Sequence, residues 1–212
     1  MAPKTKQPRF RLISPTSLIA GISLFVLIVL AFPAHAVWAD SPAVTTALPN
    51  LSSFASSIQN GEGKVIRGAY ADGLFALPIL QQPGNNAAFV STVDNTLTQF
   101  GMASQFGNVG LLAHNYLSGQ FFFQLTIGMV IQLVYGDGRI ETYQVTHIYR
   151  YRATSPNSVS SDFVDLDTQK TLTASQLFTN VYKGSRHVTF QTCITQDGNS
   201  SWGRYFVIAE PK

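Results

Sequence analysis

The only cysteine of the chain, Cys193, lies in a strand-like run from Val188 to Ile194. A second strand-like run begins at Arg204, and the polar, glycine-containing residues 195–203 between the two runs predict a loop. Two runs joined in this way form an antiparallel hairpin, in which opposed residues lie about 5 Å apart. The sequence therefore predicts a thiol and a guanidinium side by side.

A cysteine attacks a carbonyl carbon as the thiolate, and an ordinary thiol with a pKa of about 8.5 is ionised only slightly at neutral pH. A cation beside the thiol raises the thiolate fraction, and a neighbouring base can take the proton during attack. Arg204 supplies a cation that keeps its charge. A cysteine nucleophile in this position therefore requires one more group, an imidazole.

The chain has four histidines. His35 lies in the N-terminal apolar segment, and His147 falls inside a strand-like run, where a structural role is favoured over a catalytic one. His187 precedes the cysteine on the same predicted strand and lies about 20 Å from it at about 3.3 Å per residue. His114 lies where a strand-like run meets a polar loop, a position at which scaffolds present functional groups. Spacing in the sequence does not by itself bring His114 to Cys193.

The N-terminus has the pattern of an export signal. Residues 1–11 are basic, and residues 12–39 carry no charge. The basic segment, the apolar core and the small residues that end at Ala36 and Ala39 predict a secretory signal peptide. The uncharged stretch is also long enough to span a bilayer, which needs about 20 residues, with the basic flank in the cytoplasm. The sequence thus predicts an exported domain, either anchored through residues 1–39 or released by cleavage.

Composition limits the remaining possibilities. Residues 40–64 are rich in Ser, Thr, Ala and Pro and predict a spacer, and residues 65–212 predict one domain. The formal charge of +3 includes four basic side chains in residues 1–11, so the remainder has a charge of 3 − 4 = −1, which argues against a nucleic-acid partner. In an exported protein, an unpaired cysteine is a reactive thiol, an intermolecular link or an inert buried residue.

Strand-like runs separated by turn residues recur through residues 65–212. They favour a mainly β fold, a barrel or sandwich of about seven or eight short strands with short helices. The clearest hairpin has its turn at Gly136–Gly138, between two runs of alternating apolar residues. The strands predicted before the final hairpin are 73–80, 87–93, 108–113, 128–135 and 139–149. The predicted helical segments are 53–59, 96–100 with Asp94 as its cap, and 173–178.

Three segments, in this order along the chain, resemble the sortase family of cysteine transpeptidases. Leu111–Asn115 resembles the strand end with the family's histidine, although Ala113 stands where glycine is usual. Thr189–Cys193 resembles the Thr-Leu-x-Thr-Cys motif, with Phe190 in place of leucine. The strand that begins at Arg204 resembles the one that carries the family's essential arginine.

The resemblance covers roughly residues 65–212 and implies a closed β-barrel with Cys193 as nucleophile, His114 as acid and base, and Arg204 as stabiliser of the oxyanion or positioner of the substrate. It implies cleavage of a C-terminal sorting motif of the Leu-Pro-x-Thr-Gly kind in exported proteins. The acyl group would pass to an amine of the cell envelope or of a pilin-type subunit, outside the cytoplasm. This chemistry requires no metal or organic cofactor.

Residues near the predicted site leave alternatives open. Thr192 is either an extra donor to the oxyanion or substrate, or a β-branched strand residue. Trp202 either walls the substrate groove or anchors its loop. Asp162, Asp165 and Asp167 either bind calcium, as in some sortases, or form a solvated acidic loop, which is favoured because their spacing matches no known calcium loop.

Two other functions remain open from the sequence. If water instead of an amine resolves the thioester, the protein is a cysteine endopeptidase. The departures at Phe190 and Ala113 leave room for a catalytically inactive, exported β-barrel that serves as a binding module. Formation of a product that depends on an added amine separates the first alternative from a transpeptidase.

Overall fold

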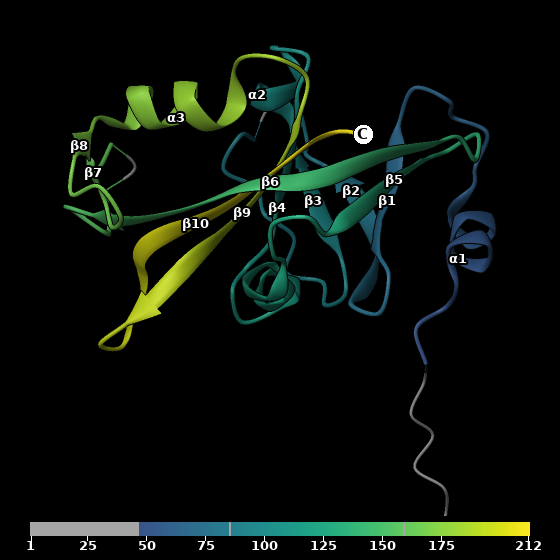
Figure 1. Cartoon of the computed structure of the whole chain (residues 1–212), viewed down its shortest axis with the longest axis horizontal. Coiled ribbons are helices and arrows are strands. Elements are labelled where there is room, and N and C mark those ends of the chain that lie inside the picture. The colour runs from purple at the N-terminus through teal and green to yellow at the C-terminus, as the bar shows by residue number, and fades with distance from the viewer. Residues whose placement is uncertain (1–46, 85, 159) are drawn as a thin grey trace, which may run out of the picture. The chain divides into compact units, whose positions relative to one another are not determined.

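Ten strands form one mixed sheet in the computed structural model, which describes residues 47–84, 86–158 and 160–212 (Figure 1). They are β1 (Ile66–Ala71), β2 (Phe75–Gln81), β3 (Leu97–Phe100), β4 (Val109–Leu112), β5 (Val130–Tyr135), β6 (Ile140–Ala153), β7 (Phe163–Asp165), β8 (Thr171–Leu172), β9 (Val188–Gln196) and β10 (Asn199–Pro211). The order is β10-β9-β4-β3-β2-β1-β5-β6-β7-β8, and a further pairing of β6 with β10 closes a barrel. The closed part contains eight strands, β1 to β6, β9 and β10, which confirms the predicted mainly β barrel.

The β5–β6 hairpin, predicted from its Asp-Gly turn, is confirmed and begins the closure. The Gly138 N–H donates to the carbonyl of Tyr135 at 2.9 Å, and Gly138 has a φ of 87°, which glycine adopts without steric cost. The first residues of β6 pair with β5, whereas residues 143–152 pair with β10. One long strand thus passes from one side of the barrel to the other.

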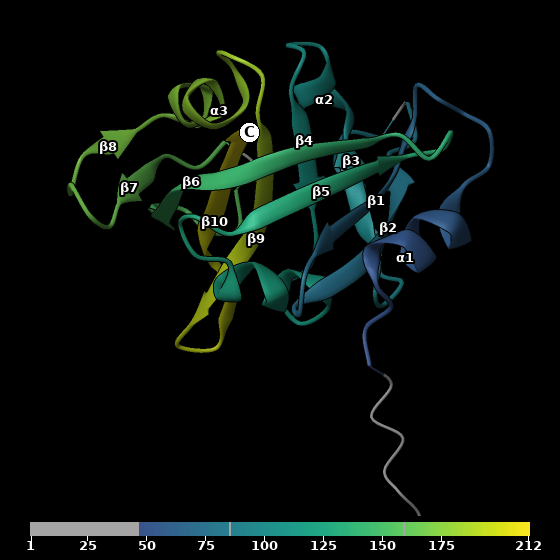
Figure 2. The ribbon, with the colours of Figure 1, turned by 45° about the vertical axis from the view of Figure 1, so that its right-hand side comes forward.

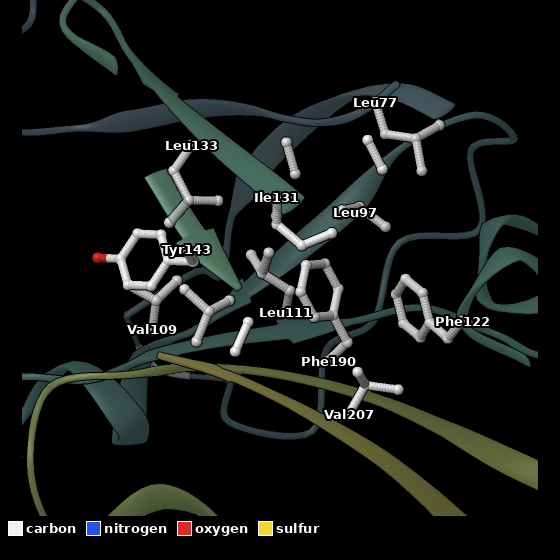
Figure 3. Packing of buried hydrophobic residues seen from close by; sticks show 14 of the residues in the cluster. Leu77, Leu97, Val109, Leu111, Phe122, Ile131, Leu133, Tyr143, Phe190 and Val207 are labelled. Carbon is white, nitrogen blue, oxygen red and sulfur yellow. The ribbon is translucent and has the colours of Figure 1, made fainter. Parts of the chain in front are cut away.

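Apolar side chains from all eight barrel strands fill the interior. Figure 3 shows Phe190 of β9 packed among them, and its ring meets that of Phe122 edge-on with 5.2 Å between centroids. Phe122 comes from the 3₁₀ helix η1 (Ser118–Gln124). Because Phe190 points into the barrel, the alternation of side chains along a strand directs Cys193, three residues later, to the outer face.

Helix α3 (Ala174–Tyr182) packs against the outside of the barrel (Figure 2). It begins with a capping box, in which the side chains of Thr173 and Gln176 each bond the other's backbone N–H. Its buried residues Leu177 and Val181 belong to an apolar cluster that includes Phe206 of β10. The predicted helix at 173–178 is therefore confirmed, and it is longer than predicted.

Helix α1 (Leu51–Ile58) confirms the helix predicted within residues 53–59. The Asn50 side chain accepts a hydrogen bond from the Ser53 N–H at 2.9 Å and caps the helix. Phe54 packs against Tyr70 and Val134 of the barrel. Part of the predicted spacer therefore lies against the barrel.

Two predictions between β2 and β4 are wrong. Residues 87–93, predicted as a strand, have no regular structure, because the Gln82 amide donates to the carbonyls of Ala87 and Phe89, both at 2.9 Å, in place of a strand partner. Residues 97–100, predicted as helical, form β3. Pairing with β2 and β4 outweighs the local cap signal, and the short helix α2 (Gly101–Ser104) follows instead.

The final hairpin has longer strands than predicted. Strand β9 continues to Gln196 and β10 begins at Asn199, so the predicted loop at 195–203 is wrong. The turn consists of Asp197 and Gly198, whose φ angles of 51° and 76° are both positive, as a two-residue turn of type I′ requires. The pairing shifts between Asn199 and Gly203, which marks a bulge in β10.

The predicted signal or membrane segment, residues 1–39, lies outside the described residues, as do residues 40–46 of the predicted spacer. Among residues 47–84, 86–158 and 160–212, no helix has the length and apolar character needed to cross a membrane. The division of the chain at residues 39 and 64 stays a prediction.

An ionic cluster lies near the starts of β4 and β9. The Glu141 carboxylate accepts hydrogen bonds from Arg139 at 2.5 Å, Arg186 at 2.7 Å and the Tyr143 hydroxyl at 2.8 Å. Burial alone would raise the pKa of Glu141, but the hydrogen bonds from Arg186 and the tyrosines outweigh it and lower the pKa to about 2. Arg186 also donates to the carbonyl of Gly107 at 3.0 Å, so the cluster joins three chain segments.

We expect Glu141→Gln to lower the free energy of unfolding by about 1 to 2 kcal/mol at pH 7, a value reduced for solvent screening because the carboxylate is partly exposed. The folded pKa lies below the unfolded one, so the contribution is complete above pH 4.5 and is lost as the pH falls toward 2. Urea unfolding of both proteins between pH 7 and pH 3 measures this difference.

The control is Glu62→Gln, which removes an exposed ion pair with Arg67 and should cost about 0.2–1 kcal/mol. An effect of Glu141→Gln no larger than that of the control, or one that grows as the pH falls, would contradict the assignment.

Candidate active site

The predicted pairing of Cys193 with Arg204 is confirmed. The two residues are opposed in the antiparallel register of β9 and β10, between the pairs Gly203–Ile194 and Tyr205–Thr192. Side chains of opposed residues lie on the same face of a sheet, so both project from the outer face. Both are partly exposed, and Cys193 is a free thiol.

Strand β4 brings the predicted histidine to the other side of Cys193. Strands β4 and β9 are parallel, with Leu112 opposite Gln191, and the N–H of Ala113 continues the ladder by donating to the Gln191 carbonyl at 3.3 Å. His114 lies two residues after Leu112, and Cys193 lies two residues after Gln191. Strand β9 therefore lies between the strand that leads into His114 and the strand that carries Arg204.

The loop after His114 is tied to β9 by contacts that the sequence did not suggest. The His114 carbonyl accepts hydrogen bonds from the N–H groups of Leu117 and Gly119, both at 3.0 Å. The Asn115 side chain donates to the Thr195 hydroxyl at 2.7 Å. This bond joins the residue after His114 to a residue two positions after Cys193.

Gly119 permits the close approach of η1 to the end of β4. A Cβ atom at this position would lie 2.3 Å from the Thr192 hydroxyl and 2.6 Å from the His114 carbonyl, so any side chain would displace one of them. The exposed ring of Tyr116 stacks on the His114 imidazole, with 5.2 Å between centroids and 22° between planes. Gly119 thus restricts the backbone of His114, and Tyr116 restricts its ring. Of these two contacts, only the one at Gly119 had a signal in the sequence, the glycine itself.

Thr192 lies on the opposite face of β9 from Cys193. Its side chain is buried, and its hydroxyl donates to the carbonyl of Ala113 at 2.8 Å. The structure therefore does not bring this hydroxyl to the face on which the thiol lies. It joins β9 to the residue that precedes His114.

The Arg204 guanidinium lies on the outer face beside Phe163, with 5.9 Å between its central carbon and the ring centroid. Nη1 donates to the carbonyls of Ser201 at 3.1 Å and Gly203 at 2.9 Å. Among the described residues, Nη2 and Nε have no hydrogen-bond partner. Arg204 is thus held by one nitrogen and has donors left for a substrate oxygen.

An apolar cavity of about 150 Å³ lies beside Arg204 on this face. Its walls include Arg204, which lies opposite Cys193 on β10, and Gln191, which lies two residues before Cys193 on β9. The other walls come from α3, β3, β7 and β10 and are apolar or aromatic: Phe100, Phe163, Ala174, Leu177, Phe178, Val181, Tyr182 and Phe206. A thiol, a cation and an apolar cavity therefore share one surface.

Trp202 lies on the other side of the hairpin. It lines an open cavity of about 560 Å³ together with Ile194 and Tyr205, the residues that alternate with Cys193 and Arg204. The bulge between Asn199 and Gly203 lets its side chain turn to this face. The structure therefore does not bring Trp202 to the surface that carries the thiol.

The remaining histidines and acidic residues have other surroundings. The buried His187 ring nitrogens lie 2.7 Å and 2.9 Å from the carbonyls of Ser185 and Val181. Asp167 forms an ion pair with Arg150, and Asp165 accepts hydrogen bonds from two backbone N–H groups. Within the described residues, no group of three or more His, Cys, Asp or Glu side chains is arranged to hold a metal ion.

No family model matches this chain, and no curated protein sequence matches it. Among solved structures, the chain is similar to the Clostridium perfringens sortase D5 transpeptidase, at 18% identity over 76% of this chain and 86% of that one, with a TM-score of 0.44. It is also similar to sortase C1 of Streptococcus agalactiae, at 17% identity, 74% and 72% coverage and a TM-score of 0.45. A third is sortase C-1 of Actinomyces oris, at 18% identity, 69% and 72% coverage and a TM-score of 0.45. Such distant likenesses concern the fold alone.

Proposed function

We propose that this protein is a cysteine transpeptidase of the sortase type. The observation that carries the proposal is the order of three neighbouring strands, in which Cys193 of β9 lies between Arg204 of β10 and the chain that continues from β4 into His114. This strand order supports a nucleophile, a permanent cation and an acid–base side chain at one site. Acyl transfer through a thioester requires these three roles.

The first half-reaction forms the thioester. The thiol proton of Cys193 passes to His114. Sγ then attacks the carbonyl carbon of the scissile amide as the thiolate, and the π electrons move onto the oxygen. The free donors of Arg204 stabilise this oxyanion. When the carbonyl re-forms, the C–N bond breaks, and the departing amine takes a proton from the His114 imidazolium.

The second half-reaction transfers the acyl group. The imidazole of His114, now neutral, removes a proton from an incoming amine as its nitrogen attacks the thioester carbonyl. The C–S bond then breaks and returns the thiolate of Cys193, and the proton taken from the amine leaves His114 as the imidazolium with which the cycle began. The product is a new amide, and the enzyme is unchanged.

The apolar cavity beside Arg204 supports a peptide donor with an apolar side chain near the scissile bond. With its aromatic and aliphatic walls, a cavity of about 150 Å³ has room for one side chain of moderate size. A leucine in a sorting motif of the Leu-Pro-x-Thr-Gly kind has this character. We therefore propose that exported proteins with such a C-terminal motif are the donors.

The acceptor in this proposal is an amine of the cell envelope or of a pilin-type subunit. The basic and apolar pattern of residues 1–39 supports a location outside the cytoplasm, with attachment to the membrane through that segment if it is not cleaved. A substrate that is itself exported would meet the enzyme there.

The test uses fluorogenic peptides with motifs of the Leu-Pro-x-Thr-Gly kind, incubated with and without triglycine as the amine acceptor. We expect a ligated product, identified by its mass, that forms only with the amine and is absent with Cys193→Ala. Cleavage at the same rate without the amine would instead establish an endopeptidase. No cleavage of any peptide, although a thiol probe labels Cys193, would favour the inactive binding module.

A further inference from the structure

A polar cavity of about 340 Å³ lies among β6, the β7–β8 hairpin and the C-terminal half of α3. Its lining includes Tyr149, Tyr151, Asp165, Lys170, Leu172 and Asn180, and none of these residues has a part in the proposed acyl transfer. Cavities that bind small molecules generally begin at about 300 Å³. The volume therefore suits a small ligand.

Tyrosine rings form one wall of this cavity. Tyr149 and Tyr151 are alternate residues of β6 and lie on one face of it, with 6.3 Å between ring centroids and 37° between planes. Tyr151 is 3% exposed, and Tyr149 is half-buried. Leu172 adds an aliphatic contact. An apolar wall with hydroxyls at its edge matches a ligand that has a C–H face and a polar rim.

The polar groups of the cavity have no protein partner that would occupy them. Among the described residues, the hydroxyls of Tyr149 and Tyr151, the Lys170 ammonium and the Asn180 amide make no hydrogen bond. Tyr151 is buried as a residue, but its hydroxyl oxygen is not among the buried atoms without a partner in the described residues, so it is accessible to a ligand in the cavity. Asp165 accepts two backbone N–H bonds through one oxygen, Oδ1, so Oδ2 is free.

The tyrosines act as donors at physiological pH. Burial, together with the nearby Asp165 carboxylate, raises the pKa of Tyr151 to about 12 and raises that of Tyr149. The cavity thus offers phenol and ammonium donors, a carboxylate acceptor and an amide that does both. Its formal charge is zero, because Asp165 and Lys170 cancel, so neither an anion nor a cation is favoured.

From these groups we infer that the cavity binds a neutral sugar residue. The hydroxyls of a sugar both donate and accept, which suits the mixed groups at the rim. Its C–H groups can pack against Leu172 and the edge of the Tyr149 ring. That ring stacks with His147 and lies beside Tyr151. An apolar side chain would leave the donors and acceptors at the rim without partners. Tyr151 lies opposite Arg204 in the pairing of β6 with β10, but the cavity shares no lining residue with the apolar cavity beside Arg204. The inference does not require the proposed acyl transfer.

The test is saturation-transfer difference NMR on the full chain, kept in solution with a detergent that has no sugar headgroup. The probes are four neutral disaccharides, namely cellobiose, maltose, lactose and N,N′-diacetylchitobiose, with glucose 6-phosphate and glutamine as charged and zwitterionic comparisons. We expect transfer to at least one disaccharide. Tyr149→Ala and Asn180→Ala should each weaken its binding about tenfold or more, the equivalent of one good contact.

Matched variants distinguish sugar binding in this cavity from sugar binding elsewhere on the protein. Lys170→Gln should change the affinity for a neutral sugar less than about threefold, since no ligand charge is lost. Tyr116→Ala removes an exposed tyrosine elsewhere and should have no effect, and Cys193→Ala should bind as the wild type does. No signal from any disaccharide, stronger binding of glutamine or glucose 6-phosphate, or equal binding by Tyr149→Ala would overturn the inference.

Discussion

Replacing Arg204 with lysine is expected to lower kcat/KM for peptide transfer about 100-fold, although the charge is kept. In the structure Arg204 uses Nη1 to bond two carbonyls of its own strand, and Nη2 and Nε have no partner among the residues that the structure describes. A lysine ammonium is one compact group of donors and cannot hold the backbone and an oxyanion in the same planar geometry. Arg204→Ala should lose as much or more.

The rate at which iodoacetamide alkylates Cys193 separates two roles of Arg204. If the guanidinium serves mainly as an oxyanion donor, Arg204→Lys should alkylate at close to the wild-type rate while its turnover falls. Arg152→Lys is the matched control, because Arg152 lies on the neighbouring strand opposite Gly203 and should keep its rate within about twofold. Near-normal turnover in Arg204→Lys would mean that only the positive charge matters.

Local pairing explains what could be predicted of the site. Cys193 and Arg204 are joined by one hairpin, so strand alternation and a short connection were sufficient to pair them. The predicted loop, residues 195–203, was longer than the observed two-residue turn. The same alternation already required that Thr192, next to Cys193, face the other way. The Thr192 hydroxyl instead donates to the Ala113 carbonyl and so joins β9 to the residue before His114.

Non-local pairing explains what could not be predicted. His114 approaches Cys193 only because β4 and β9 pair in parallel, although Leu112 and Gln191 are far apart in the sequence. The spacing of residues contains no information about such a crossover. The error at residues 97–100 has the same origin, since β3 exists through its pairing with β2 and β4 and not through its own propensity.

Replacing His114 with alanine is expected to lower kcat for the amide substrate about 10²- to 10⁴-fold, the usual contribution of one acid–base group. An amine leaves slowly unless it is protonated, and His114 is the proposed proton donor. An ester substrate with a phenolate leaving group needs no such proton. Burst kinetics should therefore show that His114→Ala forms the thioester from this ester within about tenfold of the wild-type rate.

The two substrates together decide what His114 does. Recovery with the ester and not with the amide assigns the histidine to proton transfer to the leaving amine. Equal loss with both substrates, with Cys193 alkylation slowed to the same degree, would mean that His114 acts on the thiol itself as its ion-pair partner. If neither rate changed, Cys193 and Arg204 would have to act without His114, and a different proton donor would be required.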